Sequence, residues 1–404
     1  MERKLDVYLH QTLIGSLVID LQGDMTFTYD QAYACHQQNM PLSQSLPLKM
    51  DAYNAKQCRP FFSGILPEAH LRGSIARQLG ISEHNDFALL SAIGGECAGA
   101  VSLLPSSVTP RHLSPEYRTL DDHALATILD TMHQRPMLVG EDGIRLSLAG
   151  AQDKLAVAYI NNQIAIPING APSTHILKPI NRDFPSLIEN EHFCLNLAKK
   201  IGLNTAEATL HHDIHHKPYL LIKRYDRINT EHTIERLHQE DFCQALSIVP
   251  EMKYQREGGP DLASCFQLIR QVSTQPVLDI KALLQGVLFN LMIGNNDAHG
   301  KNFSLLYDQQ QIRLAPFYDM ISTVYYPTLA SKMAMKIGSK YSFDLLYARH
   351  IMQMADAAHL SKALVRKETM SMIKKIQRHL TDSPFTATIL KRTEILLKRL
   401  NLSA

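Results

Sequence analysis

The first 30 residues alternate apolar and polar side chains in three runs, LDVYLHQ, IGSLVID and MTFTYD. A period of two is typical of β-strands that bury one face. Gly15 and the Gln22-Gly23-Asp24 segment supply turn residues within this pattern. The segment therefore predicts an opening β-meander.

From residue 41 to residue 105 the pattern becomes helical in patches, HLRGSIARQLG (70–80) and HNDFALLSAIGG (84–95), and ends in a strand-like run, AGAVSLLP (98–105). The connector PSSVTPRHLSP (105–115) is rich in proline and serine, which favours a domain boundary. We therefore expect a β-rich N-terminal subdomain over residues 1–110.

From residue 121 the chain predicts one amphipathic helix (121–134) and then several short strands. The strands are expected at 144–148, 155–160, 163–168, 174–180, 206–212 and 219–226. Asn161-Asn162 predicts a two-residue hairpin turn, because asparagine tolerates positive φ. An amphipathic helix (185–202), closed by Gly202, interrupts the strands.

Beyond about residue 239 the pattern is largely helical. An apolar helix stops at Gly294, a polar loop (295–302) follows, and the β-like runs FSLLY and IRLAPFY flank DQQQ before Asp319. This order of elements is that of a protein-kinase fold. We predict an α+β, two-lobed, kinase-like protein whose N-lobe spans 111–235 and whose helical C-lobe spans 236–404.

Composition narrows the class of protein. With 404 residues the chain has room for two or three domains, and its net charge of +2 gives no general field toward nucleic acid or membrane. The six cysteines contain no C-x-x-C pair, so most are expected to be buried and reduced. Without a signal-peptide core or an uninterrupted run of 18 apolar residues, the expectation is a soluble, cytoplasmic protein that has no membrane partner.

Three polar residues of the loop region carry the candidate chemistry. Asp297 and Asn302 have the five-residue spacing of the kinase catalytic loop, and Asp319 follows the hairpin. A carboxylate in the position of Asp297 accepts the proton of a substrate hydroxyl as the catalytic base. Asn302 and Asp319 offer the oxygen ligands that Mg²⁺ prefers.

The nucleotide requires a cation and a phosphate-binding loop. Lys178 lies late on a predicted strand, and Glu191, in the next helix, is its natural partner for holding the ATP phosphates. The loop SLAGAQDK (147–154) contains one glycine, so its amides could cover phosphates. Its ATP-binding candidates are Ala149, Gly150, Ala151 and Gln152.

Further candidates surround these residues. Lys223 and Tyr225 lie where the chain leaves for the second lobe, and their backbone groups would meet the adenine edge. His299 is a candidate to face the γ-phosphate, with loop bracing as its alternative, and Lys301 could supply positive charge. Ser147 could itself accept a phosphate.

Each signal has a plainer interpretation. The loop could be an ordinary turn between helix and hairpin, and Lys178 and Glu191 could be surface charges. The histidines of 211–216 could bind a metal, although an exposed hairpin turn fits them better. A small-molecule phosphotransferase would share the Asp-x4-Asn loop and is a second possible function. A catalytically idle subunit that only binds a partner complex is a third, although such a binding module would need none of the Lys, Glu, Asp and Asn residues named above.

The chain also resembles the HipA family of serine/threonine kinases, the toxin partners of HipB-type antitoxins. The resemblance is carried by FFSGILPE (61–68), LSLAGAQDKLAV (146–157), NEHFCLNLAKKIGL (190–203), KYQREGGP (253–260) and IGNNDAHGKNFSLL (293–306), among other stretches.

Membership of this family would imply a toxin kinase that uses ATP and Mg²⁺ and phosphorylates an aminoacyl-tRNA synthetase. It would make Ser147 the site of inhibitory autophosphorylation. It would also imply a small HipB-like helix-turn-helix antitoxin as partner, and contact with DNA only indirectly, through that antitoxin.

Overall fold

The computed structural model describes residues 3–36, 38–110, 114–230 and 233–401. The chain divides into two compact units that both draw on distant parts of the sequence. Unit 1 comprises 1–180, 209–250 and 306–310, and unit 2 comprises 181–208, 251–305 and 311–404. Residues 111–113 of the predicted connector lie outside the described residues, and the division at 110 and 235 stays a prediction.

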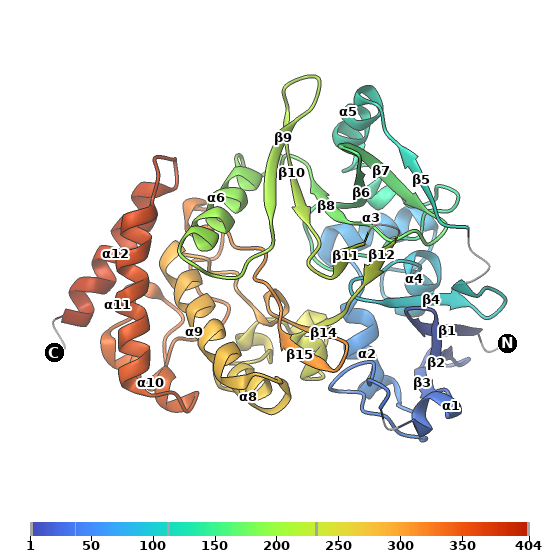
Figure 1. The fold of residues 1–404 in the computed structure, drawn as a ribbon, viewed down its shortest axis with the longest axis horizontal. Helices are drawn as coiled ribbons and strands as arrows, with labels where there is room; N and C mark the ends of the chain where they lie inside the picture. The colour runs from blue at the N-terminus through green and yellow to red at the C-terminus, as the bar shows by residue number, and fades with distance from the viewer. Residues whose placement is uncertain (1–2, 37, 111–113, 231–232, 402–404) are drawn as a thin grey trace. The chain divides into compact units, whose positions relative to one another are not determined.

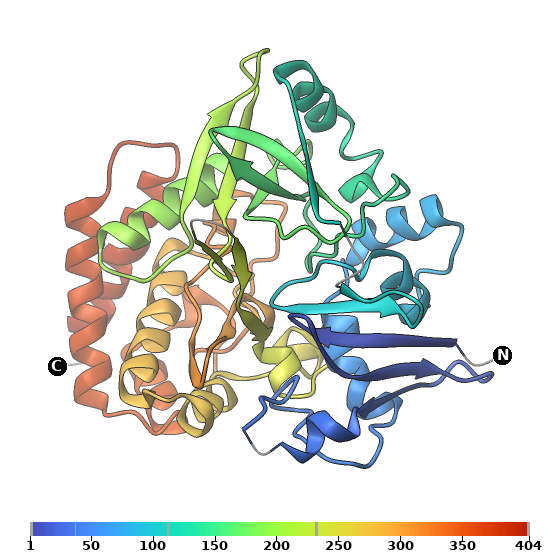
Figure 2. The same cartoon turned by 45° about the vertical axis from the view of Figure 1, so that its right-hand side comes forward.

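Unit 1 begins with the predicted meander. Strands β1 (Arg3–Leu9), β2 (Thr12–Ile19) and β3 (Met25–Tyr29) pair in antiparallel order, and β4 (Val101–Pro105) joins the free edge of β1. The sheet order is β3-β2-β1-β4, so the end of the N-terminal segment returns to its start (Figure 2).

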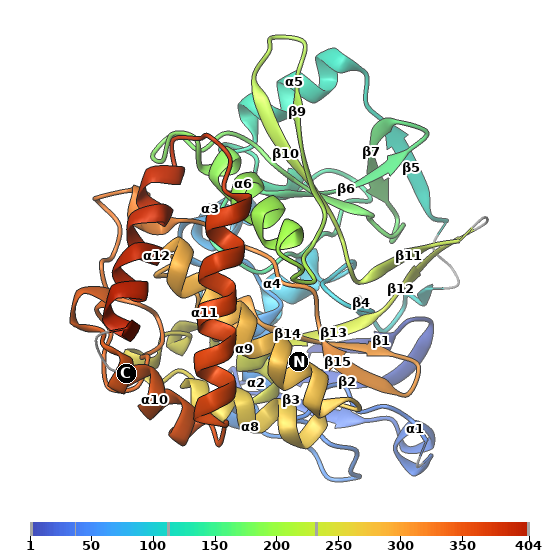
Figure 3. The ribbon, with the colours of Figure 1, turned by 60° about the vertical axis from the view of Figure 1, so that its left-hand side comes forward.

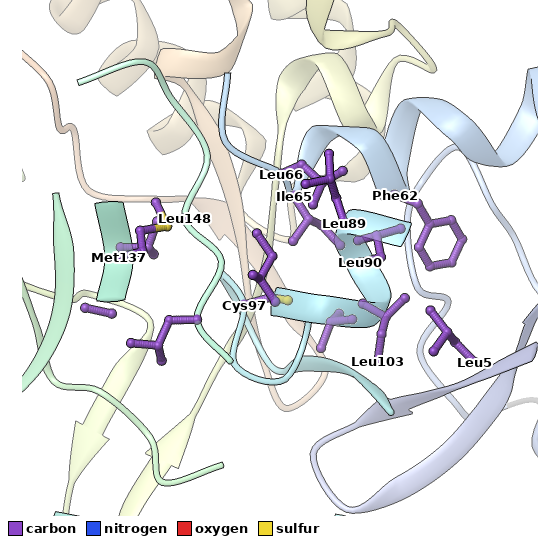
Figure 4. Packing of buried hydrophobic residues seen from close by; sticks show 14 of the residues in the cluster. Leu5, Phe62, Ile65, Leu66, Leu89, Leu90, Cys97, Leu103, Met137 and Leu148 are labelled. Carbon is purple, nitrogen blue, oxygen red and sulfur yellow. The ribbon is translucent and has the colours of Figure 1, made fainter. Parts of the chain in front are cut away.

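Four helices bury apolar residues in one hydrophobic cluster with this sheet. They are α1 (Gln31–Cys35), α2 (Ala55–Gly64), α3 (Ala69–Leu79) and α4 (Asp86–Ile93). Phe62 of α2 and Leu90 of α4 are fully buried, and both lie in one cluster with Leu5 and Leu103 of the sheet (Figure 4). The predicted helices at 70–80 and 84–95 are confirmed within two residues at each end.

The second sheet of unit 1 has the order β5-β7-β6-β8-β10-β9 (Figure 1). Its strands are β5 (Glu116–Thr119), β6 (Leu155–Ile160), β7 (Gln163–Ile168), β8 (His175–Lys178), β9 (Ala208–His212) and β10 (Pro218–Lys223), and α5 (Asp122–Thr131) lies between β5 and β6 in the chain. The predicted turn joins β6 to β7, and Asn161 and Asn162 have φ of 51° and 62°. The core cluster of the first sheet continues into this one.

One predicted strand is wrong. Residues 144–148 form only an isolated bridge, Glu96↔Leu146, and not a strand. Their backbone exchanges hydrogen bonds with the loop at Glu96, whose N–H donates to Arg145 and whose carbonyl accepts from Ser147. The apolar residues of 144–148 are buried, as the pattern predicts. Their partner is an irregular loop, however, so the backbone pairing does not continue as it would between two β-strands.

Unit 1 also contains β11 (Arg227–Asn229), β12 (Ile234–Arg236), β13 (His238–Asp241) and α7 (Phe242–Ala245). Between them and the first sheet lies a fully buried ionic cluster. Arg224 donates to Glu96 at 3.1 Å and to Asp226 at 2.8 Å, and Arg227 also contacts both carboxylates. The N–H of Gly99 donates to Asp226 at 2.7 Å, so the cluster joins residues 96–99 to 224–227.

Unit 2 is mainly helical (Figure 3). Its helices are α6 (Leu187–Lys200), α8 (Leu262–Val272), α9 (Pro276–Ile293), α10 (Ala348–Ala357), α11 (Lys362–His379) and α12 (Thr386–Asn401). The predicted hairpin appears as β14 (Ser304–Asp308) and β15 (Gln311–Leu314), and β14 runs from unit 2 into unit 1. Helix α9 packs against α8, α11 and α12.

Helix α9 is the one described helix that is long and apolar enough to span a membrane by length and composition. Of its 18 residues, 61% are buried inside the structure, which is the behaviour of a core helix. The cysteines follow the prediction, since all six are free thiols and all but Cys35 are buried.

Candidate active site

The polar loop begins after Gly294, the residue that caps the C-terminus of α9. Gly294 has φ of +76°, a left-handed conformation that glycine adopts without strain, and its N–H donates to Asn290. The side chain of Asn295 then turns back and donates to Asn290 Oδ1 at 3.0 Å, while its own Oδ1 accepts from the N–H of Asp297 at 3.1 Å. Neutral amides thus set the direction in which Asp297 leaves the helix.

A second set of hydrogen bonds fixes the loop to the segment after Asp319. The N–H of Asn296 donates to the hydroxyl of Thr323 at 2.8 Å, and that hydroxyl donates to the carbonyl of Gly294 at 3.0 Å. The side chain of Asn296 donates to the carbonyl of Ala330 at 3.0 Å. The two chain segments therefore form one rigid piece.

Asp297 is the exposed residue of this otherwise buried loop. The hydroxyl of Tyr254 donates to its Oδ1 at 2.6 Å. The ring of Tyr254 meets that of His299 edge to face, with centroids 5.2 Å apart. One carboxylate oxygen is therefore oriented by a neighbour, and the side chain as a whole is accessible to a substrate.

Asn302 and Asp319 are brought together although 17 residues separate them. Asn302 Nδ2 donates to Asp319 Oδ2 at 3.0 Å. Asp319 has φ of +55°, an uncommon conformation for a residue with a side chain, and such strain is found preferentially at functional sites. The hydroxyl of Tyr318 donates to the carbonyl of Lys301 at 2.6 Å, which joins the two segments a second time.

The donor set fits a hard divalent cation. Asn302 Oδ1 is buried, and among the described residues it accepts no hydrogen bond. An amide oxygen left in this state costs free energy unless something binds it. Beside it stands the carboxylate of Asp319, so the pair presents the oxygen ligands that Mg²⁺ prefers.

Helix α6 is hydrogen-bonded to the segment that follows Asp319. The side-chain amide of Asn190 donates to the carbonyl of Ser322 at 3.1 Å, and its oxygen accepts from the N–H of Ser322 at 2.8 Å. Glu191, the next residue, is fully buried. The predicted pairing of Glu191 with Lys178 stays a prediction, since the two residues belong to different units.

In unit 1, the predicted phosphate loop leads directly into β6. Gly150 has φ of +107°, a backbone conformation in which a residue with a side chain would be strained, and a Cβ there would also displace the end of the Lys154 side chain. Lys154 in turn donates to the carbonyl of Ala149 at 2.5 Å. Gln152 Nε2 is buried with no acceptor among the described residues, which leaves an N–H donor for a phosphate oxygen.

Lys178 lies on the strand next to this loop. Leu155 pairs with Leu177, so the first residue of β6 stands opposite the end of β8, where Lys178 is buried. Half-buried Ala149 and Ala151 lie in the loop that precedes Leu155. The structure therefore brings the loop and Lys178 to the same end of the sheet.

Ser147 is fully buried. Its hydroxyl donates to the carbonyl of Ile65 at 3.1 Å. Lys223 ends β10 and is exposed, and the hydroxyl of Tyr225 contacts the side chain of Gln239. His299 and Lys301 are buried within the polar loop 295–302.

The histidine-rich segment 211–216 ends β9 and forms most of the turn to β10, close to the hairpin turn predicted there, and most of it is exposed. No group of three metal-ligating side chains that could hold an ion occurs among the described residues. The metal interpretation of these histidines therefore has no support.

Three contributors were missed by sequence reasoning: Tyr254, Asn190 and Lys154. The first two lie in KYQREGGP (253–260) and NEHFCLNLAKKIGL (190–203), two of the stretches that carry the family resemblance. Nothing in spacing or composition marks their contacts, because each reaches a residue that is distant in sequence or forms an irregular turn.

Known proteins resemble this chain over most of its length. Residues 5–104 match the model of the HipA N-terminal domain, and residues 146–382 match that of the HipA-like C-terminal domain. A protein of Sinorhizobium fredii that carries the name kinase Y4mE is 43% identical over 92% of this chain and 89% of its own. The serine/threonine-protein kinase toxin HipA of Shewanella oneidensis is 30% identical over 94% of this chain and 88% of its own.

The structural comparison extends over nearly the whole chain. The solved complex of Shewanella oneidensis HipA, HipB and operator DNA contains a chain that superimposes with a TM-score of 0.85 at 27% identity, covering 98% of each chain. The α+β, kinase-like fold expected from the order of elements is thereby confirmed. The chain belongs to the HipA-like family of serine/threonine-protein kinases.

Proposed function

We propose that this kinase transfers the γ-phosphoryl group of ATP to a serine or threonine of a protein, with Mg²⁺ as cofactor, and acts as the toxin of a toxin–antitoxin pair. The observation that carries the proposal is the pairing of Asn302 with Asp319. It leaves a buried amide oxygen beside a carboxylate, five residues after an accessible aspartate.

Each residue of the loop would have a distinct task. Asp297 would accept the proton of the substrate hydroxyl while Tyr254 holds one of its oxygens in place. Asn302 and Asp319 would hold Mg²⁺, which neutralises charge on the phosphates when bound. The amides of Asn295 and Asn296 keep these groups oriented before substrate arrives.

Each unit has its own candidates for binding the nucleotide. In unit 1 the loop 149–152 and Lys178 would contact the phosphates, and the role of Glu191 stays the one predicted from the sequence. His299 and Lys301 would add polar contacts from the catalytic loop, and the backbone at Lys223 and Tyr225 would meet the adenine edge.

We also propose that Ser147 is an inhibitory phosphorylation site. Its hydroxyl is buried and bonded to the carbonyl of Ile65, so it must leave that position before it can be modified. A phosphate carries nearly two negative charges and could not return to this buried place. Phosphorylation would thus hold the loop away from the nucleotide.

The cellular role follows from the family. We propose a HipB-like helix-turn-helix antitoxin as partner, with DNA contacted only through it, and a cytoplasmic location. An aminoacyl-tRNA synthetase is the proposed substrate. The solved relative supports the antitoxin, since it is a complex of HipA, HipB and operator DNA.

The chemistry is tested by incubating the purified protein with labelled ATP, MgCl₂ and cell lysate. We expect label on protein from the wild type and none from Asp297→Ala or Asp319→Ala. Label that appears only on small molecules would assign a small-molecule phosphotransferase instead. A wild type that transfers nothing would favour an idle subunit.

The substrate is tested by phosphoproteomics after induced expression, with Asp297→Ala as the matched control. A synthetase peptide phosphorylated only in the wild type is the expected result, together with phosphorylated Ser147. Other substrates, or an unmodified Ser147, would overturn those parts while leaving the kinase assignment intact.

A further inference from the structure

Unit 2 contains a cavity that the proposed chemistry does not use. It has a volume of about 370 Å³ and lies between α6 and the segment that joins α11 to α12. Figure 3 shows α6 beside α11, in agreement with their direct packing. The volume is within the range of small-molecule sites.

The α6 side of this cavity is formed by one face of the helix. Glu189, Phe193, Asn196 and Lys200 line it. At 3.6 residues per turn these side chains point within about 60° of one another, on the side opposite Glu191. The cavity is therefore separate from the catalytic face of α6.

Glu189 supplies the evidence for a ligand. Its Oε2 is buried, and among the described residues it accepts no hydrogen bond. A buried carboxylate oxygen without a donor is costly, and a donor arriving from outside the chain would relieve that cost. A ligand that satisfies this oxygen would present an N–H or O–H donor.

The surroundings favour a positively charged donor. Asp382 lines the same cavity, and α11 ends there at His379, so the negative end of its dipole is nearby. Burial lowers the pKa of His192, and its Nε2 lies 2.8 Å from Asn196 Nδ2, so this histidine is neutral at pH 7. Lys200 is exposed and lies eleven residues after Glu189, about 16 Å along the helix.

The body of the ligand would meet aromatic rings. Phe193 and Phe385 both line the cavity, with centroids 5.7 Å apart, and Phe385 is buried against Tyr325. Aromatic faces attract ammonium groups and also pack against apolar or aromatic carbon. We propose that this cavity binds a small primary amine with an apolar or aromatic body, its ammonium group donating to Glu189.

Ligand binding in this cavity would affect the segment that contains Asp319. Glu189 is followed directly by Asn190, whose side chain bonds both backbone groups of Ser322. Ser322 lies three residues after Asp319. A ligand that pulls on Glu189 therefore acts on the helix turn that positions the metal-binding segment; this second step rests on the proposed function.

Binding is tested by isothermal calorimetry on the full chain with three probes of the same shape. Tyramine carries an ammonium group, tyrosol a hydroxyl and 4-hydroxyphenylacetate a carboxylate. We expect tyramine to bind and the other two to bind at least about tenfold more weakly, since hydrogen bonds to charged groups are the stronger ones. Equal binding of all three, or no binding of tyramine at millimolar concentration, would overturn the proposal.

Variants locate the site. Glu189→Gln keeps the shape and removes the charge, and we expect tyramine to bind about tenfold to a hundredfold more weakly. Glu394→Gln, an exposed change on α12 outside the cavity, is the matched control and should bind like the wild type. His192→Lys places an ammonium group three residues from Glu189 and should block the probe. Unchanged affinity in both cavity variants would place the site elsewhere.

The coupling has its own readout, the MgCl₂ concentration for half-maximal turnover. We expect tyramine to shift it about twofold to fivefold in the wild type, within the ordinary range of allosteric coupling. Asn190→Ala should keep calorimetric binding and lose the shift. Binding without a shift in the wild type would overturn the coupling alone, and calorimetry reports on the site even if the kinase assignment fails.

Discussion

Two buried polar regions of this protein are built in opposite ways. The cluster of Glu96, Arg224 and Asp226 in unit 1 is ionic, and every carboxylate oxygen in it accepts from an arginine, a backbone N–H or a side chain. The catalytic loop of unit 2 is held by neutral asparagines, and one amide oxygen, that of Asn302, accepts nothing among the described residues.

The difference separates a structural role from a functional one. Because each carboxylate oxygen of the ionic cluster already accepts a hydrogen bond, the cluster offers a ligand no further acceptor, and it joins chain segments that are more than 120 residues apart. In the loop, the neutral amides of Asn295 and Asn296 orient the backbone and add no charge of their own. Buried charge alone is therefore a poor guide to the active site.

The largest expected effect is on catalysis. Asp297→Asn and Asp319→Asn should each lower the rate of phosphate transfer by at least about a thousandfold, because the proton acceptor or the metal ligand is lost. The free energy of unfolding should change by less than about 1 kcal/mol. More than a tenth of wild-type activity in either variant, measured with labelled ATP, would contradict the assignment.

The next effect is on stability and falls on the ionic cluster. Glu96→Gln leaves Arg224 and Arg227 buried without their full counter-charge and should lower the free energy of unfolding by about 3–5 kcal/mol. Glu141→Gln is the control, since that carboxylate forms partly exposed pairs with Arg118 and Arg135 and should cost less than about 1 kcal/mol. Urea titration compares them, and equal losses would remove the distinction.

Tyr254→Phe should have a smaller effect on the loop. It deletes the hydroxyl that donates to Asp297, and a single hydrogen bond to a charged group is worth about tenfold in rate. We expect kcat to fall by that factor while KM for ATP stays unchanged. Tyr341→Phe, in the same unit but outside the loop, should behave like the wild type; a change confined to KM would show that Tyr254 serves binding instead.

The smallest effect concerns pH and a third buried carboxylate, Glu240. Burial raises its pKa from 4.5 to about 7, and this outweighs the opposing hydrogen bonds from Ser43, Tyr307 and the N–H of Gln44. The folded protein thus binds a proton that the unfolded chain releases between about pH 4.5 and 7. Stability from this group therefore falls as pH rises through that window.

Asp226 behaves in the opposite sense. Although burial alone would raise its pKa, Arg224 and Arg227 hold it well below the usual value, so its contribution is present above about pH 4 and is lost in acid. Glu240→Gln should therefore flatten the fall in stability between pH 5 and 7 by about 1–2 kcal/mol and leave the acid limb unchanged. Urea midpoints across pH test this, and an unaltered slope would exclude Glu240 as its source.

Much of the fold could be predicted because its elements follow local patterns. Alternation located β1 to β3, the two asparagines located the β6–β7 turn, and Gly294 marked the end of α9. The strand expected at 144–148 does not form. An alternating pattern predicts which side chains are buried, but it does not predict which segment the backbone will pair with. For the same reason the segments that build each unit could not be assigned from their order alone.

In the candidate site, too, some features follow from the sequence and others only from the tertiary structure. By itself the sequence determined the types and spacing of the residues that carry the chemistry, since Asp297, Asn302 and Asp319 lie within 23 residues of one another and in a recognisable order. Only the tertiary structure decided which of these residues form hydrogen bonds with one another. Asn302 donates to Asp319, Tyr254 donates to Asp297, and Asn190 donates to the backbone of Ser322. Hydrogen bonds depend on distances of a few tenths of an ångström between groups far apart in the chain, and no local pattern encodes those distances.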